Sequence, residues 1–594
     1  GRVQMFQTGP MNGEAVALFQ RSAIRPISSS LSVFLYEHMP NDTDFSISRD
    51  AGLPGLNYAF IGRQFDYHSP TSTPDNLQKR TLQDMGQQVL SATAAAAFAE
   101  RLPAKAPDLV HAQTLLGGVI AYPPVLGWGL LALCAGLLAL AVSRVRGTDA
   151  FAWKDVARGA GAAAYLLLAV ATLLHLARRA TGAEFGFIQQ RYLTAQVSRY
   201  EIALILIGLG VIFYAASALA RGKVRWSAAA LPLGAGVLCS AFGAVDPIGL
   251  GLGLGAAVAG LLVYGRPAGT AGGWTGLILT GLAGGVALQA VAPTTAFLVT
   301  WPLLLACVSA AICNLGAVRG TLSTIAVAAL AVVGLAWIGG FAHGLFLGLD
   351  MPELLAVTGW LAAFLLWPMI HPRIGGAGRI TAPLVMGAGF VLIALVRLHA
   401  PWNDRFPEAS MISYQVDART GAGRLVSSTP DLPPWSKTAL KLYGGPITTA
   451  PLPPMWLRDV NLAPAATIPL PGATLSLSTS AGRTTLDLSP PKGARVIVVQ
   501  VRATVPVSDV TLNGLPAGVL RRAGEWSRIR WQGGDPKLSI AFTPSGAGQI
   551  EVRHSSVTES WPAQAKPLPA RPSDVMAFDL SDSTVVTGEQ RLTW

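Results

Sequence analysis

The chain has 594 residues, of which 51% are hydrophobic and only 13% are charged, and its mean hydropathy is +0.45. This composition excludes a single soluble globular domain, and the length predicts several domains. The net charge of +12 is compatible with a nucleic-acid partner, but many basic residues lie in short loops between apolar runs, where they act as topology determinants. We therefore expect no nucleic-acid partner.

Short strand-like and helical runs alternate over residues 1–105. We expect strands at 3–6, 31–36 and 56–61, and helices at 12–25 and 77–101. The second helix is preceded by Thr73-Pro74-Asp75, a cap sequence with proline at an early helical position. Strands that alternate with helices predict an α/β domain in which helices cover a sheet.

Residues 106–400 form a series of apolar stretches near membrane-spanning length. We predict a polytopic domain of about ten helices in the lipid bilayer, at roughly 120–143, 156–177, 200–220, 227–245, 248–265, 273–291, 294–313, 322–346, 352–371 and 380–398. The fifth stretch contains Gly251 and Gly255, a spacing that is typical of a helix-packing face, although flexibility at a lipid-facing position is an equal reading.

The charges between these stretches predict an orientation. If residues 1–105 lie outside the cytoplasm, the inside loops are rich in basic residues such as Arg144, Arg146 and Arg221. The outside loops then hold mainly Arg178, Arg179, Arg191 and Arg199, all in one connection. This bias places both soluble parts outside the cytoplasm. The Ala- and Gly-rich composition favours a bacterial inner membrane facing the periplasm; in a eukaryote, a vacuolar or endoplasmic-reticulum membrane is expected.

Several ionisable residues fall within or beside the apolar stretches. His343 lies inside one and is a candidate functional residue, because ionisable groups at membrane depth are seldom incidental. The others lie near the ends of stretches, where an interfacial position is expected: His175, Asp246, Asp350 and Glu353.

Residues 401–594 are rich in Pro, Thr, Ser and Gly and contain short strand-like runs. We expect strands at 494–501, 537–542 and 549–553, and a tight turn at Asn513-Gly514. Together they predict an extracytoplasmic β-sandwich-like domain.

Four motifs in the first hundred residues carry the most specific information. They are Met5-Phe6-Gln7-Thr8-Gly9-Pro10, Asn41-Asp42-Thr43-Asp44-Phe45, Gly52-Leu53-Pro54-Gly55-Leu56 and the run from Tyr67-His68 to Pro74-Asp75. In this order and spacing they resemble the C-terminal half of an M28-family zinc peptidase domain. The resemblance is to the membrane-embedded branch, which includes endoplasmic-reticulum metallopeptidases and vacuolar membrane proteases.

The resemblance implies roles for individual residues. M28 enzymes bind two zinc ions, and His68 matches the family's late histidine ligand. The acidic residue that follows this ligand by four positions in relatives is Ser72 here, which changes the expected hydrogen-bond partner of the imidazole. Asp42 and Asp44 match a run close to the metals, where a helix N-cap is the alternative role. Tyr67 is expected in the substrate pocket or packed as an aromatic residue.

The remaining ligands of the family have no counterpart in the sequence, which contains no Glu-Glu pair. We expect these ligands and the general base to lie upstream of Gly1. The resemblance implies a membrane-anchored, zinc-dependent aminopeptidase that acts on peptides, of which this chain alone is inactive. The alternative is a non-catalytic transporter or scaffold that carries a degenerate peptidase fold.

Overall fold

The computed structural model describes residues 2–62, 64–148, 151–316, 318, 320–374, 378–429, 431–520, 522–533 and 536–594. The chain forms two compact units. The first contains Gly1–Tyr67 and Thr73–Ala400, and the second contains His68–Ser72 and Pro401–Trp594.

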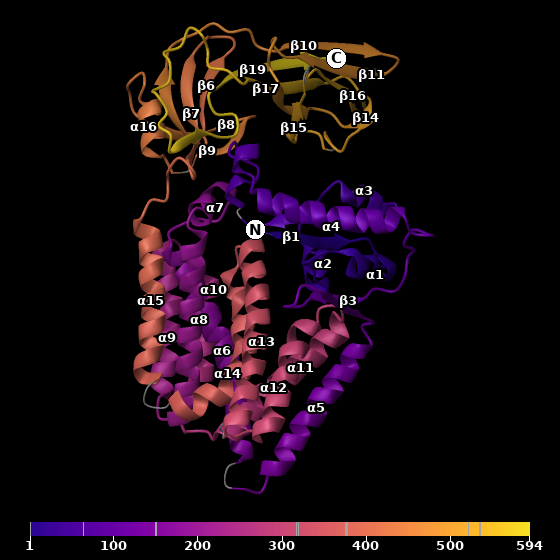
Figure 1. Cartoon of the computed structure of the whole chain (residues 1–594). Helices are drawn as coiled ribbons and strands as arrows, with labels where there is room; N and C mark the ends of the chain where they lie inside the picture. Colours follow the sequence, from indigo (N-terminus) through magenta and orange to yellow (C-terminus); the bar gives the residue numbers. More distant parts are fainter. Residues whose placement is uncertain are drawn as a thin grey trace. The chain divides into compact units, whose positions relative to one another are not determined.

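The first unit begins with two antiparallel strand pairs. Strand β1 (Arg2–Thr8) pairs with β2 (Leu56–Ile61), and β3 (Val110–Gln113) pairs with β4 (Val119–Tyr122). Single bridges link Met5 to Ser28 and Ser29 to Ala112, so that the two strand pairs are connected through residues 28 and 29. Helices α1 (Gly13–Ser22), α3 (Phe45–Asp50) and α4 (Lys79–Ala97) accompany the strands, and α4 packs against β1 and β2 (Figure 1). The predicted α/β layering is present.

The strand predicted at residues 31–36 is wrong, because this segment forms helix α2 (Ser30–Glu37). A short apolar run has no periodicity that separates a strand from a buried helix. Ser29 stabilises the start of this helix, because its hydroxyl accepts a hydrogen bond from the Ser32 backbone N–H at 3.2 Å and caps the helix.

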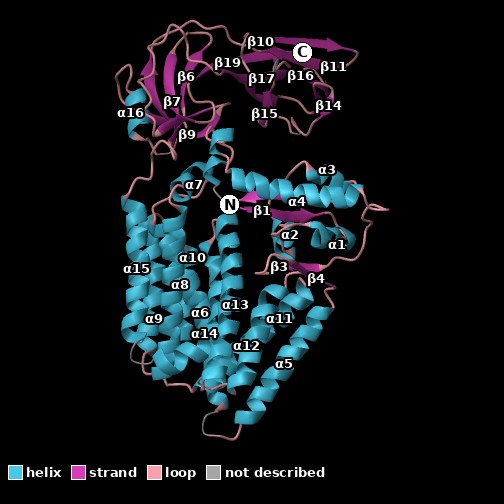
Figure 2. Ribbon diagram, in the orientation of Figure 1, coloured by secondary structure: helices cyan, strands magenta, loops and turns pink. Residues whose placement is uncertain are grey.

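All ten predicted apolar stretches contain a helix in the described part of the chain, and Figure 2 shows these helices side by side. They are α5 (Leu126–Val145), α6 (Trp153–Ala180), α8 (Val197–Arg221), α9 (Arg225–Cys239), α10 (Pro247–Val263), α11 (Thr270–Val291), α12 (Phe297–Cys313), α13 (Thr321–Gly348), α14 (Leu355–Ile374) and α15 (Gly378–Leu398). Among the described residues, seven segments are long and apolar enough to cross a membrane. Helices α9, α10 and α12 are shorter, with 15, 17 and 17 residues. The number of spans therefore stays a prediction.

Glycines bring α9 and α10 into close contact, but they are not the glycines predicted. A Cβ atom on Gly253 would lie 2.6 Å from the Pro232 carbonyl oxygen, and one on Gly249 would lie 2.8 Å from the Cys239 Cβ. A Cβ on Gly251 would meet no atom within 4 Å, and one on Gly255 would meet only Leu168. The packing face is thus shifted by two residues, which turns it by more than half of a helical circumference.

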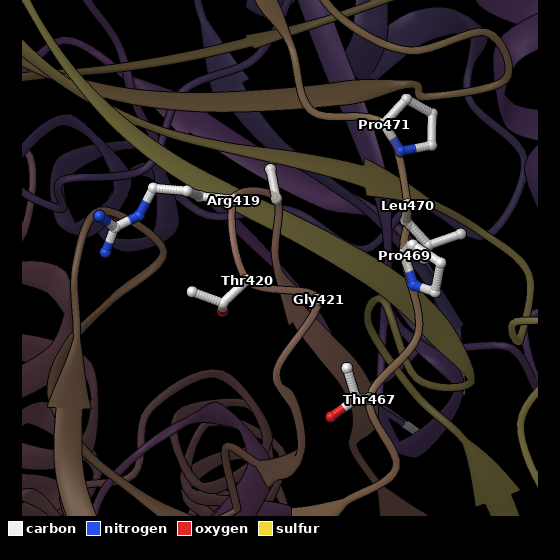
Figure 3. Close-up of a pocket in the computed structure, with 8 residues that line it drawn as sticks. Arg419, Thr420, Gly421, Thr467, Pro469, Leu470 and Pro471 are labelled. Carbon is white, nitrogen blue, oxygen red and sulfur yellow. The ribbon is translucent and has the colours of Figure 1, made fainter.

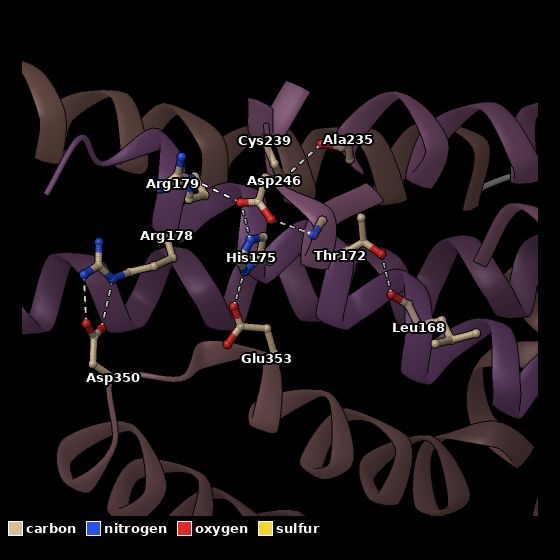
Figure 4. A network of polar contacts seen from close by, with 11 residues as sticks. Leu168, Thr172, His175, Arg178, Arg179, Ala235, Cys239, Asp246, Asp350 and Glu353 are labelled. Atoms are coloured by element: carbon tan, nitrogen blue, oxygen red, sulfur yellow. Dashed lines mark hydrogen bonds and ion pairs between the residues drawn. The ribbon is translucent and has the colours of Figure 1, made fainter. Parts of the chain in front are cut away.

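A buried polar network lies where α6 meets the start of α10 and the 3-10 turn η4 (Pro352–Leu354) (Figure 4). The His175 Nε2 lies 2.8 Å from Asp246 Oδ2, and its Nδ1 contacts Glu353 Oε1. Each contact between a ring nitrogen and a carboxylate needs one proton, so these three groups together carry a single negative charge. Arg179, whose Nε is 3.3 Å from Asp246 Oδ2, offsets it.

Arg178 forms a second buried ion pair beside this network. Its side chain is fully buried, and its Nε and Nη2 donate to the two carboxylate oxygens of Asp350 at 2.9 and 2.8 Å. Gln190 donates to the same carboxylate at 3.1 Å. The residues expected at an interface are thus ion-paired near the ends of helices, and Arg178 belongs to the last turn of α6 instead of a loop.

His343 has a different environment. Its Nδ1 lies 2.6 Å from Glu201 Oε1, between α13 and α8, and 56% of its side chain is exposed. It therefore forms a peripheral ion pair apart from the buried network.

The second unit contains two large sheets in its described part. The eight-stranded sheet has the order β15 (Ser527–Gln532), β12 (Val496–Ala503), β17 (Gln549–Thr558), β19 (Ser583–Thr593), β6 (Ile412–Asp417), β7 (Gly423–Ser427), β9 (Trp456–Ala465) and β8 (Thr448–Leu452). The five-stranded sheet has the order β10 (Thr474–Ser480), β11 (Arg483–Ser489), β16 (Leu538–Pro544), β13 (Val507–Leu512) and β14 (Leu515–Pro516).

These sheets share one apolar core, as a sandwich requires. Leu486 and Phe542 from the smaller sheet and Val499 and Val552 from the larger one belong to the same buried cluster. The predicted strands correspond to β12, β16 and β17. The predicted turn links β13 to β14, with positive φ angles of 47° at Asn513 and 85° at Gly514, as a type I′ turn needs.

The last strand, β19, lies in the middle of the larger sheet. It pairs antiparallel with β17 and parallel with β6. On one side of it, β6, β7 and β9 pack with helix α16 (Pro434–Leu440) around Tyr414 and Trp435. On the other side lies the sandwich, so β19 joins the two halves of the unit.

Removal of one partner of the Arg178–Asp350 pair should destabilise the first unit. Arg178→Met leaves the half-buried Asp350 carboxylate without its arginine, and Asp350→Leu leaves the fully buried Arg178 cation without its carboxylate. The second change should lower the free energy of unfolding by about 3–5 kcal/mol, and the first by less, because Asp350 still contacts water and Gln190. The double variant should recover most of this loss, because no charge remains unpaired. Thermal unfolding in detergent, with the exposed Arg266→Met as control, measures the effect. Additive losses in the double variant would contradict this interpretation.

The second unit should lose stability in mild acid through His554. Its ring is buried, its Nδ1 has no hydrogen-bond partner among the described residues, and burial lowers its pKa from 6.5 to about 4. The unfolded chain therefore binds a proton between these values, and stability should fall by up to about 3 kcal/mol as the pH drops from 6.5 to 4. Pulse proteolysis in urea should show a weaker pH dependence for His554→Gln, whereas His38→Gln should behave like the parent chain.

Candidate functional site

Three of the four motifs meet in the first unit. Gln7 from β1 is buried, and its side-chain oxygen accepts a hydrogen bond from the Asn57 amide of β2 at 2.9 Å. The same amide donates to the Thr43 hydroxyl at 3.0 Å. These contacts hold one residue from each motif, or directly beside it, in a single polar cluster.

A close approach of the backbone segments around Gly9 and Gly55 reinforces this arrangement. The Gly9 N–H donates to the Gly55 carbonyl oxygen at 3.2 Å. A Cβ atom on Gly9 would lie 2.8 Å from the Leu53 carbonyl oxygen, and one on Gly55 would lie 2.5 Å from the Phe45 ring. The backbone contact leaves no room for a side chain at Gly9, and a side chain at Gly55 would displace the Phe45 ring, so the three motifs are one packing unit.

Tyr36 lies at the edge of this cluster and was not expected from the sequence. Its ring packs edge-on against Phe6, with centroids 4.6 Å apart, and its hydroxyl lies near the Thr43 side chain. Burial raises the pKa of Tyr36, and the nearby charge of Asp42 and the Tyr67 hydroxyl raise it further. Asp42 and Tyr67 thus both lie within electrostatic reach of one phenol. Because a strand was expected at this segment, Tyr36 was not assigned to the site. In a helix, Tyr36 lies on the same face as the buried Val33, three residues earlier, and this spacing could have indicated its position.

The predicted acidic residues have distinct positions. Asp42 is exposed and accepts a hydrogen bond from the Thr43 backbone N–H at 2.8 Å. Asp44 is exposed and directly precedes α3, but its side chain makes no capping hydrogen bond. Asp44 therefore occupies the N-cap position of α3, as the alternative role predicts, but its carboxylate does not cap the helix.

Tyr67 and His68 follow the 3-10 turn η1 (Gln64–Asp66) and are both exposed. His68 has a positive φ of 48°, which is uncommon for a residue other than glycine and is frequent at functional sites. It begins the segment His68–Ser72 that belongs to the second unit, whereas Tyr67, Asp42 and Asp44 belong to the first. A metal site that combines His68 with either aspartate stays a prediction.

The described residues do not supply a complete metal site. Among them, no group of three or more His, Cys, Asp or Glu side chains is arranged to hold a metal ion. A catalytic zinc ion normally has three protein ligands and a water molecule, so one histidine does not fit this requirement.

Two cavities lie elsewhere. One, of about 1170 Å³, is bordered by Arg2, Arg25 and residues 78–87 in the first unit. The other, of about 400 Å³, lies in the second unit between the turn at Arg419–Gly421 and the strand-linking segment at Thr467–Pro471 (Figure 3). Neither cavity is bordered by a residue predicted to act in catalysis or metal binding.

Comparison with known proteins agrees with the motifs. Residues 1–93 match the model of peptidase family M28. Human endoplasmic reticulum metallopeptidase 1 is 34% identical over 134 residues, which are 21% of this chain and 15% of that protein. The Caenorhabditis elegans protein described as putative endoplasmic reticulum metallopeptidase 1-B is 37% identical over 94 residues, 15% of this chain and 10% of its own length.

The aligned part thus spans about 15% of the length of the mammalian relatives. No solved structure matches the chain. The family match covers the segments that form the Gln7–Asn57–Thr43 cluster and the glycine contacts. Residues 1–93 therefore match peptidase family M28, and the chain is similar over this part to the endoplasmic reticulum metallopeptidases.

Proposed function

We propose that the chain belongs to a membrane-anchored, zinc-dependent exopeptidase that removes N-terminal residues from peptides outside the cytoplasm. The observation that carries this proposal is the convergence of Gln7, Asn57 and Thr43 in the region that matches the M28 family. A hydrogen-bonded cluster with a buried glutamine is a rigid support on which a peptide site can be built.

In this proposal His68 is a metal ligand, and Asp42, Asp44 and Tyr67 border the substrate pocket. Tyr36 joins them, because its hydroxyl lies within reach of both Asp42 and Tyr67. The described residues do not complete a zinc site, so the other ligands of the two ions and the general base must come from outside them.

The apolar helices serve as the anchor in the bilayer. We propose ten spans with both soluble parts on the non-cytoplasmic side. The basic residues that follow α5 and α8 support this orientation, because positive charge favours the cytoplasmic side.

A second candidate is a non-catalytic transporter or scaffold with a degenerate peptidase domain. The lack of a three-ligand group among the described residues favours it. Sequencing of the gene upstream of Gly1 tests the two candidates: a His-x-Asp pair and a Glu-Glu pair there would favour the enzyme, and a coding sequence without them would favour the scaffold.

Replacement of His68 tests its proposed role in the protein that includes the upstream residues. His68→Ala should lower aminopeptidase turnover at least about 100-fold, because a metal ligand is lost. His38→Ala changes another exposed histidine outside the membrane region and should leave turnover unchanged. A chromogenic aminoacyl substrate measures both variants. Full turnover by His68→Ala would reject the assignment.

The 594-residue chain alone should retain little zinc and show no aminopeptidase activity, since a single histidine cannot replace the water ligands of the ion. Elemental analysis after dialysis measures the retained zinc, and the same chromogenic substrate measures turnover. Stoichiometric zinc or measurable turnover would show that the chain holds a complete site.

Reporter fusions test the topology. A reporter placed after Ser143 follows the first proposed span, and one placed after Leu398 follows the tenth. With ten spans the two reporters should lie on opposite sides of the membrane, the first in the cytoplasm. Reporters in the same compartment would refute an even number of spans.

A further inference from the structure

The connection between α6 and α8 carries a short helix, α7 (Phe187–Thr194), that contacts the peptidase region. Its Arg191 is 3% exposed, although it lies in a connection that the sequence places outside the bilayer. A buried arginine needs partners. One of them is Phe65, in the turn η1 that directly precedes Tyr67 and His68.

Arg191 holds Phe65 in two ways. Its Nη1 donates to the Phe65 carbonyl oxygen at 2.5 Å, and its guanidinium carbon lies 3.9 Å from the centre of the Phe65 ring. The planar guanidinium is suited to both contacts at once, which fixes the backbone and the side chain of the same residue. Phe65 is itself only 1% exposed.

The charge of Arg191 persists at neutral pH. Burial lowers the pKa of Arg191 to about 10, and the neighbouring Asp66 carboxylate opposes this effect. The stacking and the hydrogen bond are therefore made by a cation under physiological conditions.

Helix α7 is in turn attached to the membrane helices. Gln190 donates to the Asp350 carboxylate, which Arg178 of α6 also holds. Tyr192 donates its hydroxyl to the Val396 carbonyl oxygen near the end of α15, at 2.6 Å. The residue that holds Phe65 thus lies between two residues that are bound to the ends of membrane helices.

We propose that Arg191 is a positioning residue that sets the path of residues 65–68, and that the helical bundle is thereby a structural part of the peptidase site as well as its anchor. The backbone from Phe65 to His68 is short, so displacement of Phe65 moves Tyr67 and His68 with it. The importance of Arg191 for the peptidase site rests on the proposed role of His68, whereas its effect on the path of residues 65–68 does not.

Hydrogen exchange of the 594-residue chain tests whether Arg191 holds residues 65–68 in place. In Arg191→Ala, amides of residues 65–68 should exchange about tenfold faster or more, because the turn loses both contacts. Arg199→Ala is the matched control: Arg199 is an arginine five residues after α7 ends, it hydrogen-bonds to Gln196, and exchange at 65–68 should be unchanged. Unchanged exchange in Arg191→Ala, or an equal increase throughout α1 and α4, would overturn the proposal.

A second variant keeps the test valid if Arg191→Ala does not fold. Phe65→Leu retains an apolar side chain and the carbonyl acceptor but removes the aromatic face. It should raise exchange at residues 66–68 by a smaller factor than loss of the arginine. No increase would show that the stacking does not hold the turn.

Turnover separates this inference from the proposed function. In the protein with its upstream residues, Arg191→Ala should lower kcat at least about tenfold, and Arg191→Lys, which keeps the charge and N–H donors but not the planar guanidinium, should restore part of it. If His68→Ala is inactive and Arg191→Ala has full kcat, the positioning role is wrong. If His68→Ala is fully active while exchange at 65–68 still depends on Arg191, the proposed function fails and the structural contact remains.

Discussion

The mutual neutralisation of six charged groups, three buried and three half-buried, at one end of the helical bundle is the interaction on which the first unit depends. Three of them are cationic and three are carboxylates: His175, Arg178, Arg179, Asp246, Asp350 and Glu353. Each would be costly in an apolar surrounding without its partner. Because the partners come from α6, from the start of α10 and from the segment before α14, these helices reach a low energy only together.

The same ion pairs also determine the position of helix α7. Asp350 binds both Arg178 and Gln190, so α7 has a defined position relative to α6. From there Arg191 contacts the turn that leads to the expected ligand His68. The peptidase motifs themselves are held by short-range contacts among Gln7, Asn57 and Thr43. The region therefore combines a self-contained motif cluster with one segment that depends on the membrane helices.

Local patterns predicted much of this structure. The apolar stretches all became helices, β1 and β2 formed where expected, and Asn513-Gly514 formed the predicted turn, because these features depend on residues that are near in sequence. Residues 31–36 were misassigned, since a short apolar run does not separate a strand from a buried helix, and the capping residue Ser29 lies outside the run. The His175 and Arg178 pairs were beyond prediction, because their partners lie up to 178 residues away. For His68, the family motif indicated a ligand, but no local pattern locates the other donors.

The position of β19 has a consequence for how the second unit is made during synthesis. Strand β19 separates β6 from β17, although β6 is made about 170 residues earlier. The edge of β6 therefore stays unpaired until residues 583–593 have left the ribosome. An unpaired edge is a site at which another chain can add a strand. The half-made unit is thus exposed to misassociation for longer than a hairpin-connected sheet of the same size.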